Sequence, residues 1–106
     1  MKDTILANAD IDKVTLTQIL KSLSDPIRLE IVATLFEESQ ECSCEIFNDL
    51  GKKSNLSQHY RNLRINGLIS IRRSGVHSYL ALRQEELNQR FPHLLEAIIS
   101  NHQSES

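Results

Sequence analysis

The sequence predicts a mainly α-helical domain with a small β-hairpin, and three observations lead to this prediction. Apolar residues recur at helical spacing through most of the chain, but over residues 68–82 the period changes to two. A Ser-Gly pair at 74–75 divides that stretch into the two strands of a hairpin. The chain has 106 residues, no Trp and 40% apolar composition, which suffices for one domain with a modest aliphatic core. We expect that domain over residues 1–100 and a disordered tail over residues 101–106.

Apolar spacing and capping signals predict the first two helices. The first, over residues 11–23, carries apolar residues on more than one face, so it needs a second packing partner besides its own core. Asp25 is a suitable N-cap for the second helix, and Pro26 fits its first turn, where an N–H group has no helical acceptor. This second helix should run to about Glu38.

A short third helix and a longer, more polar fourth helix are predicted next. The third covers residues 41–51, with Cys42 or Ser43 as its N-cap. The fourth begins at about Lys53 and is ended by Gly67. Its apolar stripe has the spacing i, i+4, i+7 and consists of Leu56, Tyr60 and Leu63.

The hairpin and a last helix complete the prediction. The two strands cover residues 68–73 and 76–82. Pro92 interrupts the apolar pattern that follows, because Pro lacks a backbone donor and clashes with the preceding turn. We therefore expect a short turn over residues 84–90 and a helix over residues 91–100. This helix is so apolar that it, too, should contact a second subunit.

Positive charge is concentrated in residues 51–83. This stretch holds seven of the twelve basic residues and none of the fourteen acidic ones. Residues 1–50 carry four basic and ten acidic side chains, and residues 84–106 carry one and four. Because backbone phosphates supply most of the affinity in nucleic-acid binding, the asymmetry favours a polyanionic partner.

The pattern of the basic stretch is typical of a winged helix-turn-helix. In such proteins a polar helix enters the major groove of DNA, and the hairpin, here with two arginines near its tip, contacts the neighbouring backbone or minor groove. Amides, hydroxyls and guanidinium groups are the side chains that bond base edges and phosphates. The predicted base contacts are Ser54, Asn55, Ser57, Gln58 and His59. The predicted phosphate contacts are Lys52, Lys53, Arg61, Arg72 and Arg73, with His77 peripheral.

Two other classes of function fit the sequence less well. An enzyme is not expected, because the chain has no Gly-rich phosphate loop and no Ser/His/Asp or His-Glu-x-x-His arrangement. A winged helix that binds only another protein is an alternative, but such a surface would not need seven basic and no acidic residues. The N-terminus lacks the pattern of a signal peptide, and no apolar run approaches 18 residues. We therefore expect a cytoplasmic protein without a membrane segment.

Four stretches resemble the motifs of one known family, in the same order and at similar spacing. They are LSDPIRLEI at 23–31, ECSCEI at 41–46, NLSQHYRNLRINGLI at 55–69 and RSGVHSYL at 73–80. Over residues 15–100 the chain thus resembles the ArsR/SmtB family of bacterial repressors. The resemblance implies a homodimer that binds an inverted-repeat operator in double-stranded DNA and is released by an effector. The first and last helices would form the dimer interface through Val14, Leu16, Ile19, Leu20, Phe91, Leu94, Leu95, Ile98 and Ile99.

The sequence departs from the family pattern around the recognition helix. The turn before this helix is one residue short, and Lys52 and Lys53 stand where polar residues are usual. Cations at a helix N-terminus oppose its dipole, so the two lysines are interpreted as phosphate contacts. Tyr60 replaces the usual Leu, and its hydroxyl must therefore find a partner.

No cofactor is required, and the candidate effector is a thiophilic ion. Of the positions that match the family's zinc site in the last helix, which are Gln84, Glu86, Ala97 and Ser100, only Glu86 could bind a metal. Cys42 and Cys44 match its cysteine box and would suit As(III), Sb(III) or Cd(II), because thiolates are soft ligands. A helix N-terminus there would lower their pKa. However, a third Cys of the arsenic-type box is replaced by Phe47. Redox or persulfide sensing, and a repressor without an effector at these thiols, remain alternatives.

Overall fold

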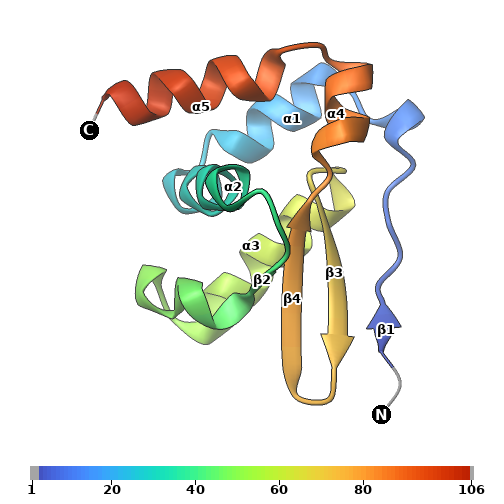
Figure 1. Cartoon of the computed structure of the whole chain (residues 1–106), viewed down its shortest axis with the longest axis vertical. Helices are drawn as coiled ribbons and strands as arrows, with labels where there is room; N and C mark the ends of the chain where they lie inside the picture. Colours follow the sequence, from blue (N-terminus) through green and yellow to red (C-terminus); the bar gives the residue numbers. More distant parts are fainter. Residues whose placement is uncertain (1–2, 106) are drawn as a thin grey trace.

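A computed structural model, which describes residues 3–105, shows the predicted winged helix-turn-helix (Figure 1). Helices build one part of the molecule, and a small antiparallel sheet with a protruding hairpin builds the other. The elements in chain order are β1 Thr4–Ile5, η1 Ile11–Lys13, α1 Leu16–Leu23, α2 Pro26–Glu38, β2 Cys42–Ser43, η2 Cys44–Leu50, α3 Lys53–Ile65, β3 Ile69–Ser74, β4 His77–Leu82, α4 Gln84–Arg90 and α5 Leu94–Ser104. Within the described residues, no helix is long and apolar enough to cross a membrane.

The first predicted helix is divided in two. A 3-10 turn, η1, is followed by extended backbone at Val14, and only then does α1 begin. Thr15 starts α1 with a capping box, in which its side chain accepts from the Gln18 N–H and the Gln18 side chain accepts from the Thr15 N–H. The prediction for α2 is confirmed, because the Asp25 carboxylate accepts from the N–H groups of Ile27 and Arg28 at 2.9 and 3.1 Å.

The third predicted helix begins later than expected. Cys42 and Ser43 form β2, which pairs with Leu80 and Tyr79 of β4, so Cys42 is a strand residue and not a helix cap. Ser43 is the N-cap of η2, as one of the two predicted alternatives, and its hydroxyl accepts from the Glu45 N–H. The ladder with β4 holds this backbone extended, which no local signal indicates.

α3 ends as its sequence predicts, at Gly67. The Gly67 N–H donates to Arg64 O at 3.1 Å, and the Leu68 N–H donates to Leu63 O at 2.9 Å, which is a Schellman arrangement. This ending needs a left-handed residue, and Gly67 has φ +83°.

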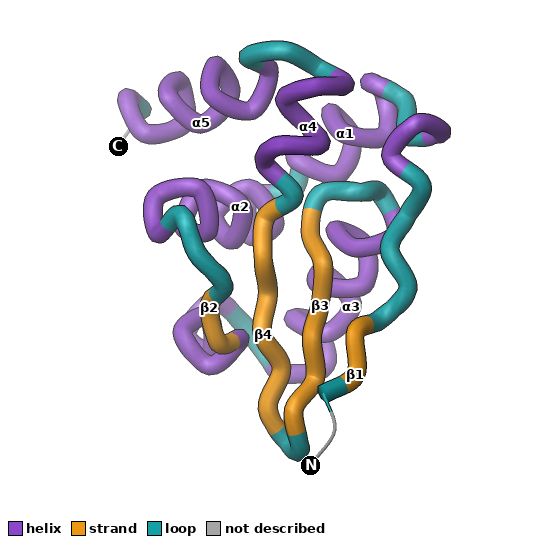
Figure 2. The backbone as a smooth tube through the Cα atoms, turned by 45° about the vertical axis from the view of Figure 1, so that its right-hand side comes forward, coloured by secondary structure: helices purple, strands orange, loops and turns teal. Residues whose placement is uncertain are grey.

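The sheet has the strand order β1-β3-β4-β2, and every pairing is antiparallel (Figure 2). β3 and β4 form the predicted hairpin, but its turn lies one residue later than predicted. Ser74 pairs with His77, so the turn residues are Gly75, with φ +63°, and Val76. The two short edge strands, β1 and β2, were not predicted. β1 pairs with β3 and runs the N-terminal segment along the edge of the hairpin.

The C-terminal helices differ from the prediction at both ends. Residues 84–90 form the helix α4 where a short turn was expected. Pro92 separates α4 from α5 as predicted, but α5 continues to Ser104 through most of the predicted disordered tail. His102 and Gln103 bond to Glu30 and Glu37 of α2, which holds this last turn in place. Ser106 lies outside the described residues.

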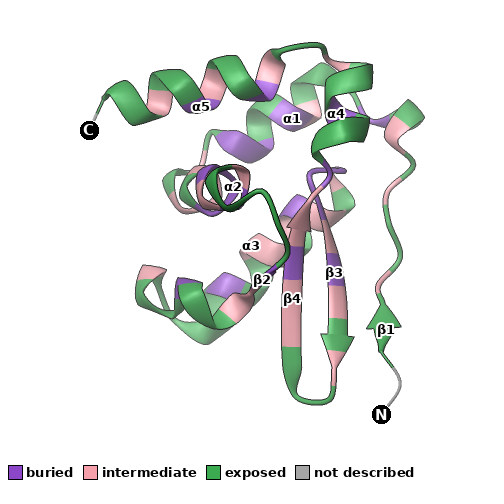
Figure 3. Cartoon of the chain, viewed as in Figure 1, coloured by how far each residue is buried: buried purple, intermediate pink, exposed green. Residues whose placement is uncertain are grey.

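The core is aliphatic and lies where the helices meet the sheet (Figure 3). It includes four of the residues predicted for the dimer interface, and these are Val14, Ile19, Leu95 and Ile99. Each is buried inside the single chain, so these four side chains leave little surface for contact with a second subunit. Leu16 and Leu20 of α1 are 46% and 47% exposed. Phe91, Leu94 and Ile98 are half-buried.

Candidate nucleic-acid interface

α3 presents a polar face to solvent and an apolar stripe to the core. Leu56 and Leu63 are buried, and the half-buried Tyr60 donates its hydroxyl to Cys44 O at 3.4 Å. Burial of Tyr60 raises its pKa to about 12, so the phenol stays protonated. The exposed residues at the start and along the outer face of α3 are Lys52, Lys53, Ser54, Asn55, Ser57, Gln58 and Arg61. All seven belong to the predicted DNA contacts.

The N-terminus of α3 has no side-chain cap. Lys52 is the N-cap residue, and its side chain accepts no hydrogen bond. Two exposed lysines therefore stand beside the positive end of a helix dipole, with backbone N–H groups directed outward. Such a terminus is suited to a phosphate group, which would complement both the dipole and the lysines.

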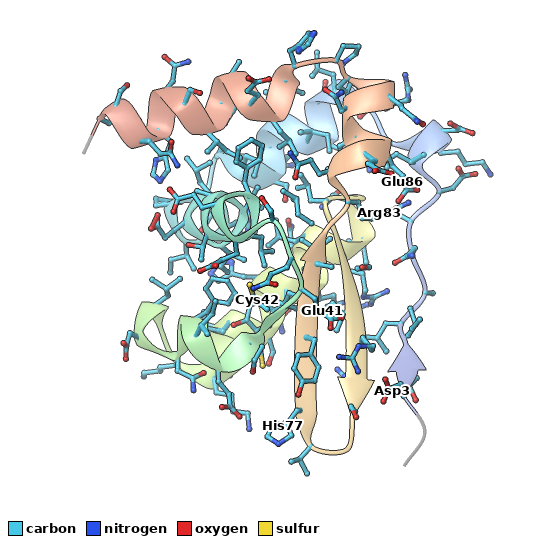
Figure 4. The ribbon with its side chains drawn as sticks, viewed as in Figure 1. Asp3, Glu41, Cys42, His77, Arg83 and Glu86 are labelled. Atoms are coloured by element: carbon cyan, nitrogen blue, oxygen red, sulfur yellow. The ribbon has the colours of Figure 1, made fainter. Side chains whose placement is uncertain are left out.

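A groove of about 810 Å³ separates α3 from the hairpin. Its basic lining comes from both elements and consists of Lys53, Arg61, Arg64, Arg73 and His77. Figure 4 shows His77 near the tip of the hairpin. The recognition helix and the wing thus form one concave, positively charged surface, except that Glu45 lies 3.1 Å from the His77 ring.

His59 does not lie on this surface as an exposed base contact. Its side chain is 15% exposed, and its Nδ1 lies 3.3 Å from Arg28 Nη1 and 4.0 Å from an Asp25 carboxylate oxygen. Arg28 is itself held by Ser22 O, to which its Nε donates at 2.7 Å. His59 therefore joins α3 to the start of α2, because it is turned toward α2 and away from the outer face of α3.

Arg72 is partly exposed and is paired with two carboxylates of the chain. Its Nη1 donates to Asp3 at 2.6 Å, and its Nε and Nη2 donate to the two oxygens of Glu41 at 3.0 and 2.7 Å. Its guanidinium also stacks on the Tyr79 ring, 4.4 Å from the centroid. Asp3 and Glu41 come from the segments that flank the hairpin (Figure 4). In this structure the predicted phosphate contact at Arg72 is thus an internal ion pair.

Two more basic residues of the stretch are used inside the chain. Arg83 is 7% exposed on its side chain, forms a bidentate pair with Glu86 and donates to Ala9 O at 2.8 Å. This pairing with Arg83 lowers the pKa of the Glu86 carboxyl. Arg64 donates to Ala7 O at 2.8 Å. The exposed cations that remain are Lys52, Lys53, Arg61 and Arg73.

The two cysteines are free thiols in different surroundings. Cys42 is buried, and its Sγ donates to Gln40 O at 3.5 Å. Burial raises the pKa of the Cys42 thiol, and the carboxylates of Glu38 and Glu41 raise it further. This is opposite to the lowering expected from a helix N-terminus, because Cys42 lies in a strand. Cys44 is half-buried and lines the groove.

The thiols do not form a complete metal site by themselves. Among residues 3–105, no three His, Cys, Asp or Glu side chains are grouped so that they could hold an ion. A thiophilic ion on Cys42 and Cys44 would need a further donor, such as an external thiol or water. The pairing of Asp3 and Glu41 with Arg72 was not predicted, because each carboxylate lies more than 30 residues from Arg72 in sequence.

The chain matches one family model and is similar to two transcriptional regulators. Residues 25–70 match the family model described as bacterial regulatory protein, arsR family. The chain is 35% identical over 86 residues to YceK of Bacillus subtilis, an uncharacterized HTH-type transcriptional regulator, with 76% of this chain and 83% of YceK covered. It is 27% identical over 73 residues to MJ1325 of Methanocaldococcus jannaschii, which carries the same description, with 68% and 82% covered.

Proposed function

The chain belongs to the ArsR family of bacterial regulatory proteins and is a DNA-binding transcriptional regulator, and on this premise we propose that it is a homodimeric repressor of an inverted-repeat operator. The observation that carries the proposal is the concave surface between α3 and the hairpin. Seven exposed polar or basic residues, Lys52 and six residues of α3, face outward, and Arg73 adds a cation from the wing. Occupation of an operator by this surface would exclude other proteins from the same DNA.

The proposed dimer rests on the apolar surface of α1. Leu16 and Leu20 are one helical turn apart and both are about half exposed. α1 and α5 lie at the end of the molecule away from the hairpin tip (Figure 1). A two-fold axis near α1 would therefore leave both recognition helices free to bind DNA. The two helices would contact DNA about 34 Å apart, which is one turn of the double helix.

DNA binding can be tested by fluorescence anisotropy with the DNA upstream of the protein's own gene. Wild type should bind this duplex more tightly than random duplex, and log Kd should depend steeply on log salt because phosphate contacts release counterions. Gln58→Ala should reduce the preference for the specific duplex by about 1–3 kcal/mol per half-site, because Gln58 is proposed to contact a base edge.

Arg73→Ala is the matched control, because Arg73 is proposed to contact phosphate. It should weaken binding to all duplexes alike and lower the salt slope by about 0.9 per subunit. Equal losses on specific and random duplex for Gln58→Ala would contradict its assignment. A wild-type protein that binds no duplex would favour the protein-interaction alternative.

We also propose a thiophilic ion such as As(III), Sb(III) or Cd(II) as the effector at Cys42 and Cys44. The supporting observation is the position of the thiols at the junction of β2, which pairs with the wing, and η2, which precedes α3. The half-buried Cys44 would bind first, and capture of the buried Cys42 would pull β2 away from Leu80. Such a movement would disturb both halves of the DNA-binding surface.

This effector proposal is tested by titrating the protein–DNA complex with each ion and, separately, with a mild oxidant. Release of DNA by an ion from wild type, but not from Cys42→Ser/Cys44→Ser, would support the ion as effector. If only the oxidant releases DNA, and only from wild type, the result would support redox sensing. Equal behaviour of wild type and the double variant would show that the thiols are not the sensor.

A further inference from the structure

The N-terminal segment is held along the molecule by four arginine side chains. It lies beside β3 and continues toward α4 (Figure 2). β1 pairs with β3, and the Leu6 N–H donates to Ile71 O at 2.9 Å. The arginine contacts, in chain order of the acceptor, are Arg72 to Asp3, Arg64 to Ala7 O, Arg83 to Ala9 O and Arg90 to Val14 O.

These contacts tie together the wing, the recognition helix and the start of α4. Arg72 is on the wing, Arg64 is in the last turn of α3, and Arg83 connects β4 to α4. Residues 3–9, which we call the strap, therefore contact the wing at one end and the recognition helix near the middle. Leu6 and Ala9 add apolar contact with the core. The strap is thus placed to set the angle between wing and helix.

Arg72 lies on the face of the sheet opposite to the DNA-binding groove. Side chains alternate along a strand, and in β3 it is Ile71 and Arg73 that line the groove beside α3. Arg72 points to the other face, where it stacks on its cross-strand partner Tyr79. A phosphate in the groove would meet Arg73, whereas Arg72 faces Asp3 and Glu41.

Two carboxylates already pair with the single positive charge of Arg72. Its Nε, Nη1 and Nη2 all donate to carboxylates, two of them as a bidentate pair with Glu41. Ser74 and Arg72 bond to Asp3 and lower its pKa, so the carboxylate is charged when the strap is in place. Glu41 precedes β2, so the same guanidinium also joins the loop after α2 to the strap.

We propose that the strap fixes the wing against the recognition helix and that Arg72 is the positioning residue that holds it, acting through Asp3 and Glu41 without a phosphate contact. This inference rests on the proposed DNA binding. It makes the acidic N-terminus part of the DNA-binding machinery, although Asp3 itself would repel phosphate.

The test compares full-length variants by anisotropy over a range of salt concentrations. Arg72→Ala and the double variant Asp3→Asn/Glu41→Gln should both weaken binding, by roughly three- to tenfold, because each releases the wing. Neither should change the salt slope, since no phosphate contact is lost. The single variant Asp3→Glu leaves Glu41 unchanged and keeps a carboxylate at position 3, so it should bind like wild type. Arg73→Ala, on the groove side, is the control that lowers the slope by about 0.9 per subunit.

Two results would overturn the proposal. If Arg72 contacts phosphate, Arg72→Ala lowers the salt slope, and the double variant gains affinity because its Arg72 is released toward DNA. If affinity and slope are unchanged in the double variant, the strap does not position the wing.

Hydrogen exchange of the free protein separates this proposal from the proposed function. In the double variant the backbone amides of β1, β3 and β4 should exchange faster than in wild type, whereas those of α1 and α2 should be unchanged. Unchanged exchange in the sheet would overturn the strap whether or not the protein binds DNA. Faster exchange in a protein that binds no duplex would retain the strap and reject the DNA-binding proposal.

Discussion

At the scale of single residues, Arg72 and Arg73 are neighbours with opposite environments. Successive side chains of a strand point to opposite faces of the sheet, so Arg73 lines the groove and Arg72 lies with Tyr79, Asp3 and Glu41 on the other face. Both add the same charge to the basic stretch. Only their direction and their partners decide which of them can meet DNA.

Gly67 is the residue where a single added methyl group should do most harm. Its φ is +83°, and a Cβ would lie 2.8 Å from Val14 Cγ2. Gly67→Ala should therefore lower the free energy of unfolding by roughly 2–4 kcal/mol, measured by urea denaturation. Gly51→Ala is the matched control, because Gly51 is extended and a Cβ there would meet no atom within 4 Å. A similar loss in both variants would contradict this reasoning.

The two cysteines should differ in reactivity. Burial raises the pKa of the Cys42 thiol, so at any given pH its thiolate fraction is below that of a free cysteine. Alkylation with iodoacetamide, followed by mass spectrometry of peptides, should modify Cys44 before Cys42, and the Cys42 rate should rise only at more alkaline pH. Equal rates in the folded protein would contradict the burial of Cys42, whereas equal rates in urea are expected.

At the scale of elements, helix ends show how local signals act. A capping box starts α1, Asp25 and Pro26 start α2, and a Schellman ending closes α3. The N-terminus of α3 is the exception, since it has lysines and no side-chain cap. This end of the recognition helix lacks a complement within the chain, which agrees with a role in phosphate binding.

The C-terminus of α2 offers a stability test. Ser39 ends this helix in the left-handed region, with φ 57° and ψ 23°. Ser39→Gly should raise the free energy of unfolding by roughly 0.5–1 kcal/mol, because glycine adopts this conformation without a Cβ clash. Ser24→Gly is the control, since Ser24 ends α1 in the right-handed region and glycine there should destabilise slightly. Thermal unfolding should show a higher midpoint for Ser39→Gly and a slightly lower one for Ser24→Gly. A lower midpoint for Ser39→Gly would contradict the prediction.

At the scale of the whole molecule, the proposed dimer surface on α1 and the basic groove lie at different ends. The exposed leucines of α1 are at the end away from the hairpin tip, and the basic groove lies between α3 and the hairpin. The N-terminal segment folds back onto the basic stretch, where Asp3 accepts from Arg72, 69 residues away in sequence. The described residues span 38 × 32 × 22 Å.

Dimerisation can be tested at α1. Leu16→Lys/Leu20→Lys places two charges on the proposed interface and should yield a monomer in analytical ultracentrifugation. Operator affinity should fall roughly 10²-fold, because each half-site is then bound by a separate monomer and the two binding events no longer support each other. Ile46→Lys is the control, since Ile46 is equally exposed but lies on η2. A monomeric wild type, or a double variant that remains dimeric, would contradict the proposed interface.

The sequence by itself determined those features that depend on a few neighbouring residues. Apolar spacing and capping signals were enough for α2, α3, the hairpin and the break at Pro92. The concentration of basic residues in 51–83 indicated a polyanionic partner. The outer face of α3 followed from its three-residue apolar stripe, because helical geometry relates the two faces.

Sequence reasoning grouped residues by charge, polarity and spacing. Only the tertiary structure decided which members of these groups contact one another. β1 and β2 became strands through pairing with the hairpin, and Val14 and Ile19 were assigned to the core of one chain. The partners of His59 and Arg72, and the Ala9 carbonyl to which Arg83 donates, lie 31 to 74 residues away in sequence. Charge and hydrophobicity give each side chain a tendency, but the choice among a carboxylate, a carbonyl and a phosphate depends on distances that exist only after the chain has folded.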